Sequence, residues 1–185
     1  MIKAIFFDLD DTLIWDQKSV EEAFRATCLL AQKRYCLDPG KLEEAVRASA
    51  RNLFSSYVTY PFTQKIGISP FEALWGDFQD VGEEFQELRK MAPAYRKNAW
   101  TQGLLALGID DTDFGHHLGE TFPKERKKVP LVFPDTFPVL DQAKQNFRLL
   151  LLTNGSPSLQ RMKLALTPRL IPYFEHVVIS GDFGT

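Results

Sequence analysis

The chain has 185 residues, of which 44% are hydrophobic and 25% charged, so it can bury a core as one domain carrying an insertion. Its net charge of −2 argues against a nucleic acid or an anionic membrane as a partner. Its apolar runs fall far short of the roughly 20 residues of a membrane span, and its start resembles no secretory signal, so we expect a cytoplasmic protein.

The first expected element is a strand over residues 2–7, which are almost all apolar. Such a run is typical of a strand that is buried at the centre of a parallel sheet. Three carboxylates follow it at once, those of Asp8, Asp10 and Asp11, with only Leu9 between the first two. Carboxylates this close repel one another, so their presence at the end of a buried strand needs a reason.

Residues 16–128 are expected to be helical. The predicted helices are one that begins at a capping box of Ser19 and Glu22, one over 38–57, a short one from Ser69, one over 83–107 that is broken near Pro93, and one over 111–126. The basic run over 124–128 is either a solvated end of this helical block or a basic lip that attracts an anionic substrate.

Residues 129–185 change to an alternation of helices and strands. The predicted elements are a helix over 136–146, a strand over 147–152, a helix over 158–166 and a strand over 176–180. Strands that are joined by helical crossovers form parallel sheets. We therefore expect an α/β fold in which residues 1–15 and 129–185 form the core and residues 16–128 are an all-helical insertion.

Polar groups come directly after the first two strands. Asp8 and Asp10 follow the first strand, and Thr153 and Asn154 follow the second. Ligands of open parallel sheets bind just beyond the carboxyl ends of the strands, so these groups meet at one site if the strands are neighbours. The sequence therefore favours an enzyme.

The paired carboxylates indicate phosphoryl chemistry with a divalent cation. Mg²⁺ prefers oxygen ligands and keeps several waters, so one or two carboxylates and a phosphate oxygen suit it. One carboxylate could attack phosphorus, while the other protonates the leaving alkoxide and later deprotonates a water. The hydroxyls of Thr12 and Thr153 could hold phosphate oxygens. The alternative for any single aspartate is that it caps a turn.

These residues carry a resemblance to a known family. Residues 8–13, DLDDTL, resemble the first motif of the haloacid dehalogenase (HAD) superfamily, and residues 150–155, LLLTNG, resemble its second motif. The helical insertion resembles the cap of that superfamily's first cap class. The resemblance implies a Rossmann-like core with a parallel sheet, a Mg²⁺ cofactor and a small phosphorylated metabolite as substrate.

The same resemblance implies a role for each matching residue. Asp8 would be the nucleophile that forms an aspartyl-phosphate, and it would bind the metal. Asp10 would be the general acid and base, and its backbone carbonyl would be a second metal ligand. Thr153 and the Asn154 amide would bind the phosphoryl group. An aspartate at position 10 points to phosphate monoester hydrolysis, because true dehalogenases of this superfamily have an aromatic residue there.

The insertion resembles that of a group of bacterial phosphoserine phosphatases, which makes L-phosphoserine the candidate substrate. Such a substrate needs a cation for its carboxylate and an acceptor for its ammonium group. Arg96, Arg126 and Glu72 are available, although nothing in the sequence places them at the site, and a solvated surface role is the alternative for each.

The pattern departs from the family near the end of the chain. The family's third-motif lysine and fourth-motif acidic pair are not found in the 185 residues, and Lys163 is a poor substitute in mid-helix. We therefore expect a chain that stops early, that is weak or inactive as a phosphatase, and whose strand over 2–7 forms an exposed apolar edge. The alternative function is a non-catalytic HAD-like protein that binds phosphates or a partner.

Overall fold

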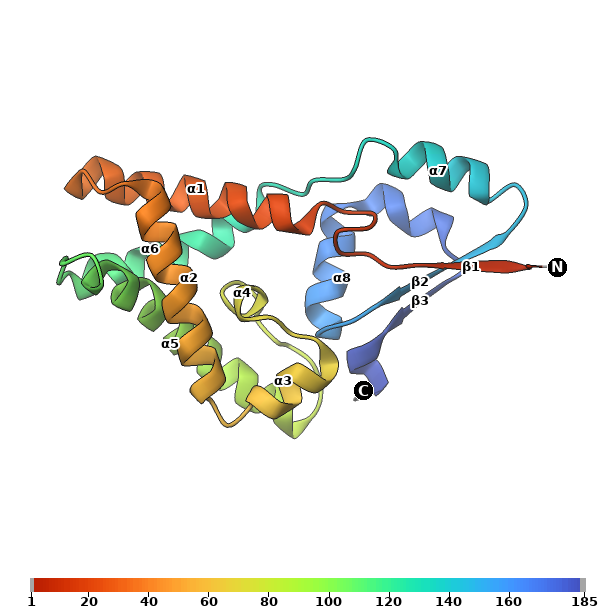
Figure 1. The fold of residues 1–185 in the computed structure, drawn as a ribbon. Coiled ribbons are helices and arrows are strands. Elements are labelled where there is room, and N and C mark those ends of the chain that lie inside the picture. Colours follow the sequence, from red (N-terminus) through yellow and green to blue (C-terminus); the bar gives the residue numbers. More distant parts are fainter. Residues whose placement is uncertain (1, 184–185) are drawn as a thin grey trace.

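The structure is a computed structural model, and it describes residues 2–183. In chain order the elements are β1 (Ala4–Phe7), α1 (Asp16–Tyr35), α2 (Pro39–Ser56), α3 (Tyr60–Ile66), α4 (Pro70–Ala73), α5 (Glu83–Leu105), α6 (Thr112–Lys127), α7 (Thr136–Ala143), β2 (Arg148–Thr153), α8 (Pro157–Leu166), the 3₁₀ helix η1 (Pro168–Tyr173), β3 (His176–Ile179) and the 3₁₀ helix η2 (Ser180–Phe183). The long helices lie together on one side of the molecule, and the strands lie with α7 and α8 on the other (Figure 1).

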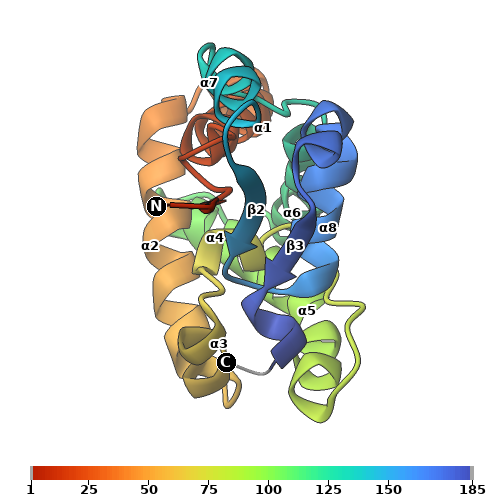
Figure 2. The ribbon, with the colours of Figure 1, turned by 90° about the vertical axis from the view of Figure 1, so that its right-hand side faces the viewer.

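The three strands form one parallel sheet in the order β1-β2-β3. Phe6 is paired with Leu150, and Thr153 is paired with Ile179. Figure 2 shows β2 and β3 side by side, with α7 at one end of the sheet and α8 beside it. The α/β fold with a parallel sheet is therefore confirmed, and the first two strands are neighbours, as a shared site requires.

The two faces of the sheet differ in burial. Leu149 and Leu151 are buried in a cluster with Leu140 of α7 and Leu164 of α8. The opposite face is more open, because Phe6 is 60% exposed there. The prediction that residues 2–7 are buried at the centre of the sheet is therefore wrong for the described part of the chain. The expectation of an exposed apolar edge is confirmed.

The inserted helices enclose a hydrophobic core to which α8 contributes Leu159. Its largest buried side chains are aromatic, namely Phe24, Trp75, Tyr95 and Trp100. The predicted break near Pro93 is wrong, because α5 runs through this residue without interruption. Proline in a helix costs about 3 kcal/mol, and the packing of α5 against both α2 and α6 offsets that penalty.

Two connections join the insertion to the sheet region, and they run side by side. The amide of Trp15 donates to the carbonyl of Leu131 at 2.9 Å, and the amide of Phe133 donates to the carbonyl of Leu13 at 3.3 Å. The rings of Trp15 and Phe133 stack with their centroids 5.0 Å apart. These contacts support the proposed boundaries near residues 15 and 129, and the division itself stays a prediction.

The helix starts show which capping signals were read correctly. The capping box of Ser69 and Glu72 is present at α4, as predicted. The one predicted at Ser19 is wrong, because α1 already begins at Asp16 and the buried Ser19 hydroxyl donates to the carbonyl of Val129.

None of the helices in the described part of the chain combines the length and the apolar composition that a membrane crossing requires.

Candidate functional site

The turn after β1 presents Asp8 to solvent. Leu9 is fully buried, and its carbonyl accepts from the amides of Leu13 and Ile14, each at 3.0 Å, so the chain winds tightly around this residue. Asp11 has a φ of 54°, a left-handed conformation that aspartate tolerates better than most residues. The Asp8 carboxylate is exposed, and its hydrogen bond from the Thr12 hydroxyl is long, at 3.4 Å. Asp8 therefore remains available to a ligand.

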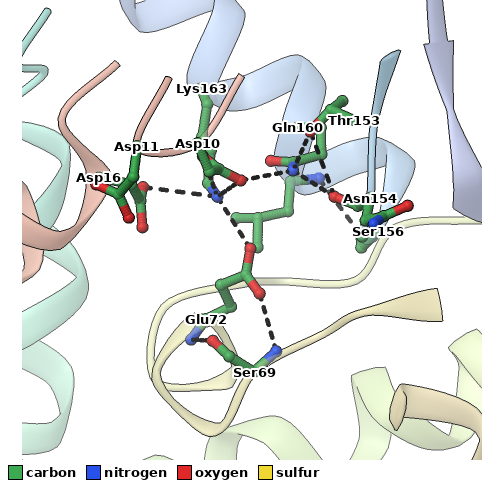
Figure 3. Close-up of polar contacts among 12 residues, drawn as sticks. Asp10, Asp11, Asp16, Ser69, Glu72, Thr153, Asn154, Ser156, Gln160 and Lys163 are labelled. Atoms are coloured by element: carbon green, nitrogen blue, oxygen red, sulfur yellow. Dashed lines mark hydrogen bonds and ion pairs between the residues drawn. The ribbon is translucent and has the colours of Figure 1, made fainter. Parts of the chain in front are cut away.

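The end of β2 meets the same turn through a residue of α8. The Gln160 amide nitrogen donates to the Thr153 hydroxyl and to the Asp10 carboxylate, each at 2.9 Å, and also to the Asn154 carbonyl (Figure 3). Three of the five predicted site residues, Asp10, Thr153 and Asn154, are thus brought together around one buried glutamine. Asp8 and Thr12 contact each other at the adjoining turn and make no hydrogen bond to this group among the described residues.

A buried lysine lies at the centre of the site. The Nζ atom of Lys163 is 2.9 and 2.8 Å from the two carboxylate oxygens of Asp10, and 2.9 Å from Glu72 (Figure 3). It is also 3.5 Å from a carboxylate oxygen of Asp16. These partners come from the turn after β1, from α4 and from the start of α1. Lys163 therefore ties the inserted helices to the sheet region at the site itself.

The charges in this cluster shift the pKa of Asp10 and that of Lys163. Burial raises the pKa of Asp10, Lys163 lowers it, and Asp16 and Glu72 raise it, so that the result is a raised pKa. Burial alone would lower the pKa of Lys163, but Glu72, Asp10 and Asp16 together outweigh it and raise that pKa. Lys163 therefore stays cationic, and Asp10 holds a proton more readily than an exposed aspartate does.

Sequence reasoning gave Lys163 little weight and did not consider Gln160 or Asp16. The sequence did contain a signal for Lys163 and Gln160, because they are three residues apart in a helix that starts just after the Thr153–Gly155 stretch. Residues at that spacing point to the same side of a helix. The contact with Asp16 had no such signal, because it depends on how α1 leaves the turn.

The two predicted arginines are engaged elsewhere. Arg96 donates to the Asp77 carboxylate at 2.9 Å and to the carbonyl of Gly76. Arg126 is buried, pairs with Asp16 and lies 4.5 Å from the centroid of the Trp75 ring. Neither guanidinium is therefore free for a substrate carboxylate. Because Arg126 is buried, the alternative of a solvated surface role is wrong for it as well.

A second set of contacts holds the inserted helices against the amino-terminal end of α8. The Asp80 carboxylate accepts from the Ser158 amide at 2.6 Å and from the Ser158 hydroxyl at 2.7 Å. It also accepts from the Ser156 hydroxyl at 2.5 Å. A carboxylate is favoured at this position because the first amides of a helix lack intrahelical partners. The insertion is therefore docked on the site from two directions.

The donors near Asp8 suit one kind of metal ion. Within residues 2–183, no group of three or more His, Cys, Asp or Glu side chains is arranged to hold an ion. Both carboxylate oxygens of Asp10 accept hydrogen bonds from Lys163, whereas the exposed Asp8 carboxylate accepts one long hydrogen bond, from Thr12. Mg²⁺ often takes one or two carboxylates and fills its other positions with water and phosphate oxygens. The oxygen donors present fit this mode of Mg²⁺ coordination, with Asp8 as the side-chain ligand.

The chain is similar to known proteins over almost its whole length. A family model described as haloacid dehalogenase-like hydrolase matches residues 2–185. The chain is 32% identical over 190 residues to a phosphoserine phosphatase from Thermus thermophilus, and the match covers 99% of this chain and 70% of that protein.

Solved structures resemble the fold at lower identity. The HAD-hydrolase YfnB from Bacillus subtilis, solved with bound magnesium, matches with a TM-score of 0.56 and 17% identity over 99% of this chain. A dehalogenase solved with an intermediate complex matches with a TM-score of 0.51 and 16% identity, also over 99% of this chain. This chain spans 65% and 64% of the lengths of those two proteins.

Proposed function

Because this chain belongs to the haloacid dehalogenase-like hydrolase family, we propose that it hydrolyses the phosphate monoester of a small metabolite through an aspartyl-phosphate on Asp8. L-phosphoserine is the proposed substrate, since the relative from Thermus thermophilus is a phosphoserine phosphatase. The observation that carries the proposal is the meeting of the β1 and β2 ends, where Asp10, Thr153 and Asn154 surround Gln160 beside the exposed Asp8.

Asp8 takes the role of nucleophile because it is exposed and nearly free of hydrogen bonds at the end of β1. Its carboxylate oxygen attacks phosphorus, and the bond from phosphorus to the ester oxygen breaks. A bound Mg²⁺ would be held by Asp8 and would neutralise charge on the phosphoryl group. The Thr12 hydroxyl lies 3.4 Å from an Asp8 carboxylate oxygen, which supports a role for it as a donor to a phosphoryl oxygen.

Asp10 takes the role of general acid and base. It would give its proton to the leaving alkoxide and later take a proton from the water that hydrolyses the aspartyl-phosphate. Lys163 and Gln160 act as positioning residues, because they hold both carboxylate oxygens of Asp10 at hydrogen-bond distance. Because the Asp10 carboxylate is held in one orientation, less entropy is lost when the reactive geometry forms.

Turnover by this chain is proposed to be slow. Among the described residues no lysine or arginine forms an ion pair with Asp8, and Lys163 is committed to Asp10, Glu72 and Asp16. Few cationic side chains therefore stabilise the charge that develops on the phosphoryl group. Such electrostatic stabilisation is a large contribution to catalysis. We expect turnover below about 1 s⁻¹, the lower end of ordinary enzymes.

The test is phosphate release from L-phosphoserine and from p-nitrophenyl phosphate, with and without Mg²⁺. The parent chain should release phosphate only with Mg²⁺, and Asp8→Asn should release none. Asp135→Asn is the matched control, because Asp135 is an exposed aspartate with no side-chain capping bond. Phosphate binding without any release would favour the non-catalytic alternative, and release by Asp8→Asn would remove Asp8 as nucleophile.

A further inference from the structure

Helix α8 carries the two side chains that hold the Asp10 carboxylate, Gln160 and Lys163. The inserted helices and their loops contact α8 at two places along its length. Glu72 forms an ion pair with Lys163, and the Asp80 carboxylate binds the first turn of the helix. The position of α8, and with it the arrangement around Asp10, therefore depends on both contacts.

Asp80 uses both of its carboxylate oxygens to bind the start of α8. One oxygen accepts from the Ser158 amide at 2.6 Å. The other accepts from the Ser158 hydroxyl at 2.7 Å and from the Ser156 hydroxyl at 2.5 Å. The amide of Gln79 adds a bond to the Ser158 hydroxyl at 3.2 Å. Hydrogen bonds to a carboxylate are about twice as strong as those between neutral groups, so Asp80 fixes where α8 begins.

The loop that carries Asp80 is held in an unusual conformation. Phe78, two residues earlier, is fully buried in the core of the inserted helices and has a φ of 46°. A bulky residue rarely takes a positive φ, and such strain persists only where the surrounding structure imposes it. Arg96 supports the same loop, because it donates to the carbonyl of Gly76 and, at 2.9 Å, to the carboxylate of Asp77. The loop therefore presents Asp80 to α8 in one fixed position.

Asp80 has no part in the chemical steps proposed above, since its hydrogen bonds go to the start of α8. Building on the phosphatase function proposed above, we propose that Asp80 is a positioning residue for proton transfer by Asp10. By fixing the first turn of α8, it sets where Gln160 and Lys163 meet the Asp10 carboxylate. A displacement of about 1 Å at a reacting group can lower a rate by a factor of about 100.

The proton that Asp10 donates is needed by some leaving groups more than by others. Phenol has a pKa of about 10, like the tyrosine side chain, so phenolate leaves phosphorus much faster when its oxygen receives a proton. The nitro group of p-nitrophenolate spreads the negative charge, so this group leaves without a proton. Phenyl phosphate and p-nitrophenyl phosphate thus have similar shapes but differ in their need for a general acid.

The experiment measures kcat/KM for phosphate release from these two aryl phosphates in the presence of Mg²⁺. This constant covers the steps up to the departure of the leaving group, so the later hydrolysis of the aspartyl-phosphate does not enter it. Asp80→Ala should lower the value for phenyl phosphate at least about tenfold more than the value for p-nitrophenyl phosphate. Asp10→Asn should show the same pattern with a larger difference, because it removes the proton donor. A change in phosphate binding affects both substrates alike and cancels in their ratio.

Further variants separate positioning from support of the fold. Asp80→Asn can keep the bond from the Ser158 amide, so it should change the ratio less than Asp80→Ala does. Ser158→Ala removes the hydroxyl and keeps the charge of Asp80; it should change the ratio in the same direction, and it serves if Asp80→Ala unfolds. Asp110→Ala is the matched control and should keep the parent ratio. Asp110 is an exposed aspartate in the connection between α5 and α6, which Figure 1 shows far from α8.

The outcomes separate this inference from the function on which it rests. If the parent chain hydrolyses neither substrate, or if Asp10→Asn keeps the parent ratio, the proposed function is wrong and the inference falls with it. If Asp10→Asn changes the ratio while Asp80→Ala and Ser158→Ala keep it, the phosphatase proposal stands and the inference is overturned. An equal loss with both substrates in Asp80→Ala would also overturn it, because Asp80 would then support only the fold. So would a changed ratio in Asp110→Ala, because the effect would then be one of general charge.

Discussion

Replacing Lys163 by Met should destabilise the fold strongly. The Lys163 side chain is only 2% exposed and pairs with Asp10 and Glu72, with Asp16 close by. Methionine has a similar length, so the main effect is that three partly buried carboxylates lose their central cation. Breaking a buried ion pair by removing one partner costs about 3–5 kcal/mol. For a chain of this length that corresponds to a fall in Tm of roughly 10 °C.

The loss should also depend on pH. The folded-state pKa of Asp10 is already above its ordinary value, so the stability that Asp10 contributes falls as pH rises through that pKa. Lys163 lowers the pKa of Asp10, so this pKa rises further in the variant. The pH range over which the variant loses stability then extends to higher pH. The difference between parent and variant should therefore be small near about pH 4 and largest at neutral pH.

Urea unfolding followed by circular dichroism, at mildly acidic and at neutral pH, measures both effects. Lys144→Met is the control, because Lys144 is exposed and its ion pair with Asp141 lies on the surface; its unfolding midpoint should match that of the parent. A Lys163→Met variant within about 1 kcal/mol of the parent at neutral pH would refute the reasoning. So would a difference that does not change with pH.

Two further predictions concern packing and thiol reactivity. Gly103→Ala should lose about 1–3 kcal/mol of stability in the same unfolding assay. Alanine is the better helix former, but a Cβ at this position of α5 would lie 3.1 Å from the Val46 backbone and closer still to the Val46 side chain. Val46→Ala in the same chain should restore part of the loss, and full stability of Gly103→Ala would contradict this packing. Burial raises the pKa of the Cys28 thiol to about 12, whereas Cys36 is exposed. A thiol reagent at mildly alkaline pH should therefore label Cys36 in the native chain and Cys28 only after unfolding, and rapid labelling of both would be evidence against the buried position.

Much of the fold could be predicted because its signals are local. The strand predicted at residues 147–152, the Asp38–Pro39 helix start and the Ser69–Glu72 capping box each depend on a few neighbouring residues. The structure has all three, with the strand one residue later, at Arg148–Thr153. The failures came where distant contacts decide. The hydroxyl of Ser19, the predicted helix cap, donates to the carbonyl of Val129, which is far from it in the sequence.

The candidate site was predictable only in part. The positions of Asp8, Asp10 and Thr153 follow from a general rule about the ends of parallel strands. The cluster around Lys163 does not follow from that rule, because it needs Glu72 from an inserted helix to come within 2.9 Å of a residue of α8. Helix-face spacing could have pointed to Lys163, but its partners depend on how the insertion packs.

The most direct test of the central claim is to trap the phosphorylated chain. The parent chain and Asp8→Asn are mixed with Mg²⁺ and L-phosphoserine, quenched in acid within the first turnover, digested and analysed by mass spectrometry. The account predicts one added phosphoryl group on the peptide that contains Asp8 in the parent chain, and none in Asp8→Asn. A phosphoryl group on any other residue, or release of phosphate with no adduct on Asp8, would contradict it.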